Sequence, residues 1–248
     1  MQFLDSGVQY TRKSIKNSRM DAIMKISNDT LSLLKWMTTL NGGIRIDPGT
    51  KIYSKSATGS MLAYAEVKED FPHAFCTANL QKFLATVSLF DDPEFEFYDK
   101  HVVISSTNGK NKSIFYQSKE SCVQQPNKTP KPQTEISMEF HLKSDDLQKV
   151  FKAASVMNVP EVCFRASGGL ITFSALNKAE ESTDTYDTII GECNPDIDLI
   201  YYFKKNYFKI LTDFSYDVEI YSTGLSKFSA TDSPFNRLDV YAVTLQSE

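Results

Sequence analysis

The sequence lacks the cysteine spacing and the long apolar runs that several protein classes require. Its four cysteines lie far apart, and none belongs to a Cys-x-x-Cys pair. A disulfide framework or a zinc site is therefore a weak hypothesis, and free thiols in a reducing compartment are the better interpretation. No apolar run is long enough to span a bilayer, and the N-terminus has no apolar core of a signal peptide. We therefore expect a soluble intracellular protein without membrane contact.

Sequence motifs of common enzymes are also missing. The chain has no phosphate-binding glycine loop, no nucleophile elbow and no His-Glu metal helix. Isolated histidines and two acidic pairs are the only candidates for such chemistry: His73, His101, His141, Asp91-Asp92 and Glu180-Glu181. Surface histidines and turn chemistry explain these residues more simply than acid–base catalysis does. We predict no enzyme activity, no catalytic residue, no metal and no cofactor, and a metal-dependent nuclease fits poorly.

Positive charge is not in excess over the whole chain. The 27 Lys and Arg residues against 31 Asp and Glu give a net charge of −4. A protein that coats nucleic acid with its whole surface would carry the opposite sign. Any contact with DNA must therefore come from a local basic stripe. The 248 residues, 41% of them hydrophobic, leave room for one large or two ordinary folded domains.

Two breaks divide the chain. Residues 1–23 are basic and show little apolar periodicity, which indicates a disordered extension or an upstream start codon before Met24; a basic arm that touches DNA is the alternative. Residues 118–134 contain three prolines and no periodicity, so we interpret them as a linker. The linker separates two predicted domains of similar size, 24–117 and 135–248.

Each predicted domain contains the same order of elements, two helices set among antiparallel strands. The predicted helices cover residues 28–40, 79–90, 145–157 and 205–214. Ser27 and Lys35 in the first half align with Ser144 and Lys152 in the second. The shared order makes an internal duplication more credible than chance matching of small polar residues.

On an ideal helix, all four segments place small, neutral polar and lysine side chains opposite an apolar stripe. For any one lysine, an ordinary solvated helix surface is the simpler explanation. Four such surfaces in an acidic chain favour a concave wall that attracts phosphates. The lysines that we predict to face DNA are Lys35, Lys82, Lys149, Lys152, Lys205 and Lys209.

Several segments of the chain resemble a known family. Met24-Lys25-Ile26-Ser27 and Asn79-Leu80-Gln81-Lys82-Phe83-Leu84 are similar to the sliding clamps of T-even-like tailed phages, and the likeness continues to the C-terminus through Phe173-Ser174-Ala175-Leu176-Asn177-Lys178. The order and spacing of these segments are fairly specific, although no single one is diagnostic. Residues 1–23 have no counterpart in the family pattern.

The resemblance implies an α+β DNA-clamp fold, with two similar domains that each pack two helices on antiparallel sheets. Three subunits would form a six-domain homotrimeric ring that encircles double-stranded DNA without sequence preference and tethers a DNA polymerase for processive synthesis. Subunits would join through edge strands, with 112–117 as one candidate. A β-rich oligomeric virion or structural protein that does not encircle DNA is the alternative.

The resemblance also implies partners and a cellular location. Besides DNA polymerase, the expected partners are an ATP-dependent clamp loader and late-transcription proteins, in the cytoplasm of an infected bacterial host. Family clamps accept a partner's C-terminal peptide in an apolar groove beside the linker. Weak candidates for this groove are Val123, Pro126, Tyr241 and Val243, and ordinary strand or linker positions explain each of them equally well.

Overall fold

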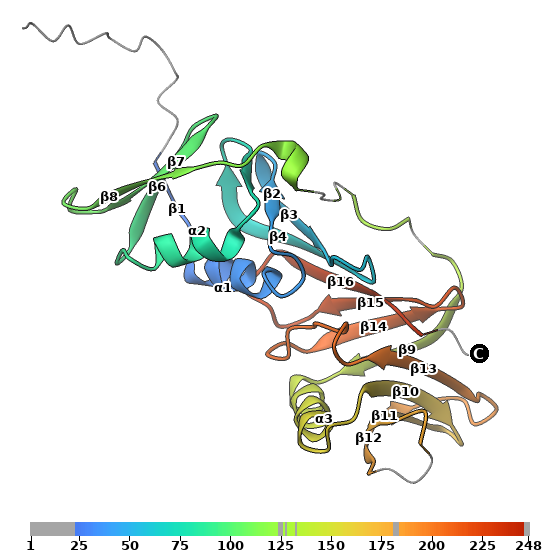
Figure 1. The fold of residues 1–248 in the computed structure, drawn as a ribbon. Coiled ribbons are helices and arrows are strands. Elements are labelled where there is room, and N and C mark those ends of the chain that lie inside the picture. Colours follow the sequence, from blue (N-terminus) through green and yellow to red (C-terminus); the bar gives the residue numbers. More distant parts are fainter. Residues whose placement is uncertain (1–22, 124–125, 127, 132, 181–183, 246–248) are drawn as a thin grey trace, which may run out of the picture.

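The computed structural model describes residues 23–123, 126, 128–131, 133–180 and 184–245 (Figure 1). Its helices and strands follow the predicted order on both sides of the predicted linker, except that residues 205–214 form no helix. The interpretation of residues 1–23 as an extension falls almost wholly outside the described residues and stays a prediction. The division into domains 24–117 and 135–248 also stays a prediction.

The first half contains two helices and eight strands: β1 (Met24–Lys25), α1 (Asn28–Met37), β2 (Ile44–Ile46), β3 (Gly49–Lys55), β4 (Met61–Phe71), β5 (Phe75–Thr77), α2 (Leu80–Val87), β6 (Pro93–Phe97), β7 (His101–Ser106) and β8 (Lys112–Tyr116). A short 3-10 helix, η1 (Glu120–Cys122), begins the linker. The second half contains β9 (Ile136–Leu142), α3 (Ser144–Val156), β10 (Glu161–Ser167), β11 (Leu170–Leu176), β12 (Tyr186–Glu192), β13 (Leu199–Lys204), β14 (Tyr216–Tyr221), β15 (Leu225–Ala230) and β16 (Arg237–Val243).

One six-stranded sheet joins the two halves. Its order is β3-β4-β16-β15-β14-β9, and β4 pairs with β16 from Glu66↔Arg237 to Met61↔Ala242. Two four-stranded sheets, β1-β6-β7-β8 and β12-β11-β10-β13, lie at opposite ends of the molecule, and β2 pairs with β5 alone (Figure 1). All of these pairs are antiparallel, as predicted.

Side-chain caps explain where the first two helices begin. The Ser27 hydroxyl accepts a hydrogen bond from the Thr30 N–H at 3.2 Å, and the Asn79 amide oxygen accepts one from the Lys82 N–H at 2.8 Å. Glu69 of β4 reinforces the first cap, because its carboxylate accepts from the Ser27 N–H at 2.7 Å. Burial disfavours this charge, but the hydrogen bonds from Ser27 and Thr30 outweigh burial and lower the pKa of Glu69.

The predicted fourth helix, 205–214, is wrong. In this segment only the Phe208 N–H reaches the carbonyl four residues back, that of Lys204, at 2.9 Å. Asn206 and the β-branched Ile210 weaken a short helix. Phe208 and Ile210 are both buried, a spacing of two that a helix cannot place on one side. Phe208 stacks on Phe203 of β13 at 4.7 Å between ring centroids, so tertiary packing sets this segment's conformation.

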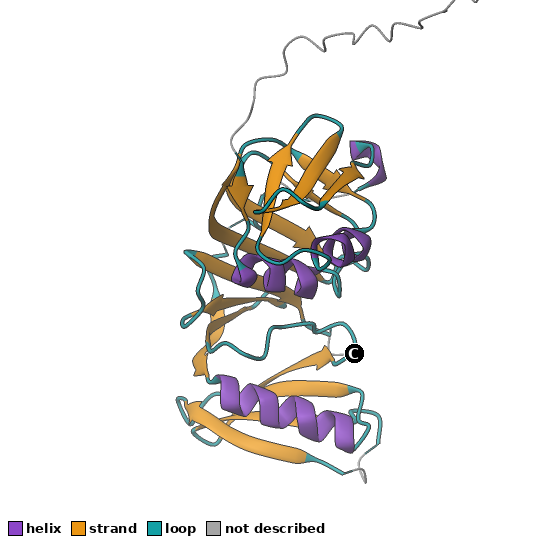
Figure 2. Ribbon diagram, turned by 90° about the vertical axis from the view of Figure 1, so that its left-hand side faces the viewer, coloured by secondary structure: helices purple, strands orange, loops and turns teal. Residues whose placement is uncertain are grey.

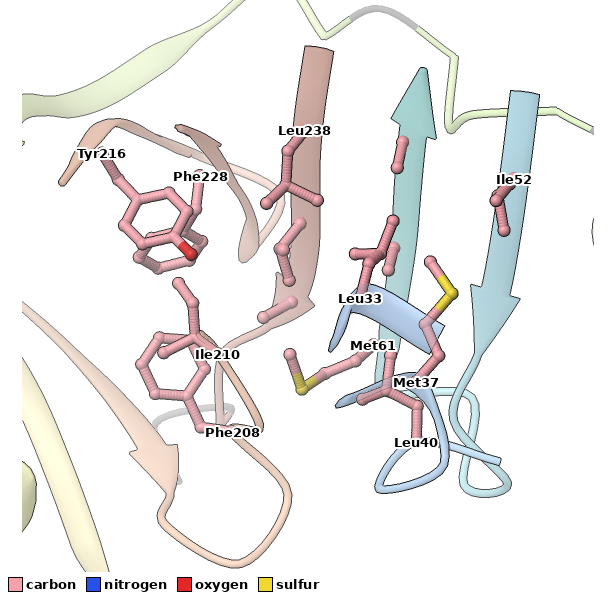
Figure 3. Close-up of a cluster of buried hydrophobic side chains, with 14 of the residues drawn as sticks. Leu33, Met37, Leu40, Ile52, Met61, Phe208, Ile210, Tyr216, Phe228 and Leu238 are labelled. Atoms are coloured by element: carbon pink, nitrogen blue, oxygen red, sulfur yellow. The ribbon is translucent and has the colours of Figure 1, made fainter. Parts of the chain in front are cut away.

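The second half therefore has one α-helix within the described residues, where two were predicted. A continuous hydrophobic core nevertheless runs through both halves. Figure 3 shows Met61 of β4 between side chains of the first half, such as Met37, and Ile210 of the second. The irregular segment thus fills the position of a helix by supplying the side chains that close the core.

Candidate nucleic-acid interface

Helices α1, α2 and α3 lie on the same side of the molecule (Figure 2). Each buries one stripe against the sheets; in α2, for example, the stripe is Leu80, Phe83 and Val87. The opposite surface of each helix is exposed and carries lysine. These exposed lysines are Lys35 on α1, Lys82 on α2, and Lys149 and Lys152 on α3.

These lysines carry little compensating negative charge. Lys149 approaches Asp146 only at 3.9 Å, and the Lys149 side chain stays 60% exposed. Within the described residues, no carboxylate lies within ion-pair distance of Lys35, Lys82 or Lys152. A hydrated ammonium group on a flexible side chain can attract a passing phosphate without holding it in one geometry.

The prediction that Lys205 and Lys209 lie on a helix is wrong, because residues 205–214 form no helix. The Lys205 ammonium group is partly buried and donates a hydrogen bond to the Ala154 carbonyl at 2.9 Å. The same carbonyl also accepts from the Val159 N–H at 3.1 Å, so Lys205 adds a second, charged donor near the negative C-terminal end of α3. Lys209 is exposed in the irregular segment after β13. The structure thus brings four of the six predicted lysines together on helices and gives Lys205 a structural contact.

The predicted groove residues fall into two neighbouring clefts and one buried site. Val123 and Pro126 line a cleft of about 500 Å³ whose other walls come from Asn41, Lys55, Ser56, Ala57 and Gly59. Val243 is 52% exposed and lines a second, apolar cleft of about 150 Å³. The walls of the second cleft also include Ser60, Met61, Tyr207, Phe208 and Leu245. Since Gly59 and Ser60 are consecutive, the two clefts adjoin.

Tyr241 lines neither cleft. It is 8% exposed, and burial together with the nearby Asp239 carboxylate raises its pKa to about 12. Its hydroxyl is hydrogen-bonded to Thr129 of the linker. Tyr241 therefore holds the linker against the six-stranded sheet.

Sequence reasoning missed the aromatic wall of the second cleft. The helical pattern predicted that Tyr207 is buried, but Tyr207 is 50% exposed and its neighbour Phe208 is buried. The error follows from the wrong helix, whose periodicity turns Tyr207 toward the core, whereas the irregular segment buries Phe208. No local pattern marks Met61 or Leu245 as cleft residues, because both read as ordinary strand residues.

Comparison with known proteins gives a consistent family. The family model described as gp45 sliding clamp, C terminal, matches residues 139–236. The sliding clamp of Vibrio phage KVP40 is 32% identical over 209 residues, which cover 83% of this chain and 94% of that protein. This chain belongs to the sliding clamp family. The sliding clamp of Enterobacteria phage T4 is 29% identical over 68% of this chain and 75% of its own length.

Solved structures of clamps share this clamp's fold at low sequence identity. The proliferating cellular nuclear antigen of Entamoeba histolytica has a TM-score of 0.63 at 11% identity, covering 88% of this chain and 95% of that one. The A. fulgidus PCNA bound to the C-terminal region of FEN-1 has a TM-score of 0.64 at 9% identity, covering 88% and 96%. The predicted clamp fold is confirmed, and the comparisons give the virion-protein alternative no support.

Two further observations concern other classes of site in this clamp. No helix in the described ranges is both long and apolar enough to cross a membrane. Among the same residues, no three His, Cys, Asp or Glu side chains gather so that they could hold a metal ion.

The contact of Lys205 yields a test that separates a lysine with a structural contact from an exposed one. Lys205→Met removes a charged donor from the end of α3, and we expect a loss of about 1 kcal/mol, or about 2–4 °C in Tm for a chain of this size. Thermal unfolding measures this effect. Lys209→Met is the matched control, because Lys209 is exposed; an equal fall in Tm for both variants would contradict the assignment.

Proposed function

We propose that three copies of this clamp close into a ring around duplex DNA and tether a DNA polymerase, without chemistry of their own. The observation that carries the proposal is a set of exposed lysines on three helices that lie on one side of the molecule, of which Lys35, Lys82 and Lys152 have no ion-pair partner among the described residues. In a ring, each of these lysines is present three times around the DNA. A closed ring cannot leave DNA sideways, so a bound polymerase stays at high effective concentration near the primer end.

The joint between the two halves suggests how subunits meet. Within the chain, β4 of the first half pairs with β16 of the second. The internal duplication makes β12 the counterpart of β4, and β8 the counterpart of β16. Both β8 and β12 are edge strands of their sheets. Pairing β8 of one subunit with β12 of the next repeats the same joint, and a constant rotation at each joint closes a ring.

Exposed apolar side chains on these two edges support the pairing. Ile114 and Tyr116 on β8 are 50% and 73% exposed, and Ile189 on β12 is 63% exposed. An open edge with apolar side chains is prone to pair with another strand. The predicted edge at 112–117 is thus an edge strand, and β12 is the partner that sequence reasoning left unassigned.

By correspondence with the joint inside the chain, the strand registers predict which residues oppose each other across the proposed joint between subunits. The register shifts directly after Glu66 along β4, and directly after Ile189 along β12. Because these two shifts match, Ile189 corresponds to Glu66, and Asp187 corresponds to Tyr64. Tyr64 opposes Asp239 inside the chain.

The six-residue strands β7 and β15 locate the other side of the joint. The first residue of β7 pairs with Tyr116 of β8, and the first residue of β15 pairs with Val243 of β16. Tyr116 therefore corresponds to Val243, and counting back along both strands makes Lys112 the counterpart of Asp239. Lys112 of one subunit therefore opposes Asp187 of the next, and opposite charges meet.

The two adjoining clefts are the proposed site for partners. A. fulgidus PCNA has been solved with the C-terminal region of FEN-1 bound, and its fold is shared here. We propose that the clefts accept C-terminal segments of DNA polymerase, of an ATP-dependent clamp loader and of late-transcription proteins, in the cytoplasm of an infected bacterial host. The apolar walls of the second cleft suit a hydrophobic side chain of such a segment.

A substitution in the second cleft tests partner binding. Val243→Asp places a carboxylate in an apolar cleft, where desolvation of the charge opposes docking of a hydrophobic side chain. We expect at least tenfold weaker binding of the cognate polymerase, measured by calorimetry in the absence of DNA. Leu170→Asp, at an exposed apolar position 40% accessible to solvent, is the control. Equal affinity for the Val243→Asp variant and the unaltered protein would exclude this cleft.

Retention on DNA tests the proposed function as a whole. Mass measurement in solution should give a trimer, and clamps loaded on closed circular DNA should be released when the circle is cut. Release on linearisation requires a topological link, which a binding protein without a ring lacks. A stable monomer, or equal retention on circular and linear DNA, would overturn the proposal.

A further inference from the structure

Two cysteines meet where the linker leaves the first half of the chain. Cys76 on β5 is 3% exposed, whereas Cys122 in η1 is exposed. The Cys76 thiol donates to the Lys119 carbonyl at 3.9 Å, and the Cys122 N–H donates to the same carbonyl at 2.9 Å. One carbonyl oxygen therefore lies against both residues, which places the two cysteines as near neighbours.

The chain on the N-terminal side of Cys122 is firmly attached beside β5. The Gln117 amide oxygen accepts from the Cys76 N–H at 2.8 Å, and the Ser118 N–H donates to the Cys76 carbonyl at 2.9 Å. Glu120 forms an ion pair with Arg45 at 2.7 Å. By contrast, no side chain caps the N-terminus of the three-residue turn η1. A small rearrangement of this turn can bring Cys122 to Cys76 while the attachment beside β5 stays in place.

Cys122 is directly followed by a wall of the first cleft. Val123 lies so close to Gly43 that a Cβ atom at Gly43 would be 3.2 Å from the Val123 Cγ2. Val123 and Pro126 together line the cleft. Any movement of η1 toward β5 must therefore move Val123 and change the shape of the cleft.

We propose that Cys76 and Cys122 form a reversible disulfide that fixes the start of the linker against β5 and reshapes the adjoining cleft. The oxidant is a low-molecular-weight disulfide such as oxidised glutathione. The exposed Cys122 thiolate attacks one sulfur of the oxidant and releases one thiolate, which leaves a mixed disulfide on Cys122. The Cys76 thiolate then attacks the Cys122 sulfur, the protein disulfide forms, and the second small thiolate leaves.

The burial of the four cysteines sets the order of these steps. Cys122 is the only exposed cysteine among the described residues. Burial raises the pKa of Cys76, so its thiolate is scarce and its attack follows as the slower step. Burial raises the pKa of Cys163 to about 11, which keeps Cys163 out of the exchange at neutral pH.

The chemical part of this inference is testable without DNA or polymerase. The trimeric or monomeric protein is incubated with oxidised glutathione at pH 8, and intact mass and peptide mapping identify the products. We expect a loss of about 2 Da and a single Cys76–Cys122 cross-link, reversed by dithiothreitol. Cys122→Ser, a substitution on the surface, should give no cross-link. A stable mixed disulfide on Cys122 with no Cys76–Cys122 cross-link would overturn the inference.

The structural part is read by hydrogen exchange at the start of the linker. The cross-linked protein should exchange amide hydrogens at residues 119–123 several-fold more slowly than the reduced protein, and the Cys122→Ser variant should not respond to oxidant. Unchanged exchange in a cross-linked sample would overturn the claim that the bond fixes the linker. The effect on partners rests on the proposed function; weaker polymerase binding after cross-linking is expected. Slowed exchange in the cross-linked protein with unchanged polymerase affinity would refute only the control of the cleft.

Discussion

Lys112→Glu is expected to shift the trimer toward monomers by about 100-fold in its association constant. An exposed ion pair contributes about 0–1 kcal/mol, and its reversal to a like-charge pair costs a similar amount. Since each ring repeats the substituted contact at every joint, a loss of about 1 kcal/mol per joint becomes about 3 kcal/mol, and 1.4 kcal/mol corresponds to tenfold. Sedimentation over a range of protein concentrations measures the shift, which should shrink at high salt.

The complementary substitution decides whether Lys112 and Asp187 face each other. Asp187→Lys alone should weaken the trimer to a similar degree, and the double variant Lys112→Glu/Asp187→Lys should restore it. A mixture of the two single variants should not restore a three-membered ring fully, because an odd ring of alternating subunits contains one mismatched joint. A double variant that dissociates as readily as either single variant would refute this register.

The three helices and the order of the strands could be predicted because local signals agree with the tertiary structure. Ser27 and Asn79 cap helices whose apolar stripes then face the core. The segment 205–214 could not be predicted in this way. Its sequence carries a helical spacing of apolar residues, but the stacking of Phe208 on Phe203 decides its conformation, and that contact depends on how β13 packs.

The candidate site shows the same division. The exposure of Lys35, Lys82 and Lys152 follows from helix periodicity alone, so the sequence predicts it correctly. The contact between Lys205 and Ala154 joins residues that are far apart in the sequence, and periodicity carries no information about it. The proposed joint between subunits was also inaccessible, because the order of elements alone does not show that β4 of the first half pairs with β16 of the second.

Charge reversal on the helices should have a large effect on DNA without opening the ring. The double variant Lys82→Glu/Lys152→Glu replaces attraction by repulsion at two exposed positions in every subunit. We expect at least tenfold less protein retained on circular DNA at about 0.1 M salt, where charges more than about 10 Å apart are screened, and a flatter dependence of retention on salt. Sedimentation of the variant should still give the trimer, because neither residue lies on β8 or β12.

A matched double variant separates the helix surface from net charge. Lys51→Glu/Lys68→Glu makes the same change in charge at exposed positions on strands β3 and β4. If general electrostatic attraction held the protein on DNA, both double variants would lose retention equally. If the helices line the opening, the strand variant should keep its retention, since its charges lie away from the helical surface. Equal losses in the two variants, both still trimeric, would mean that α2 and α3 do not face the DNA.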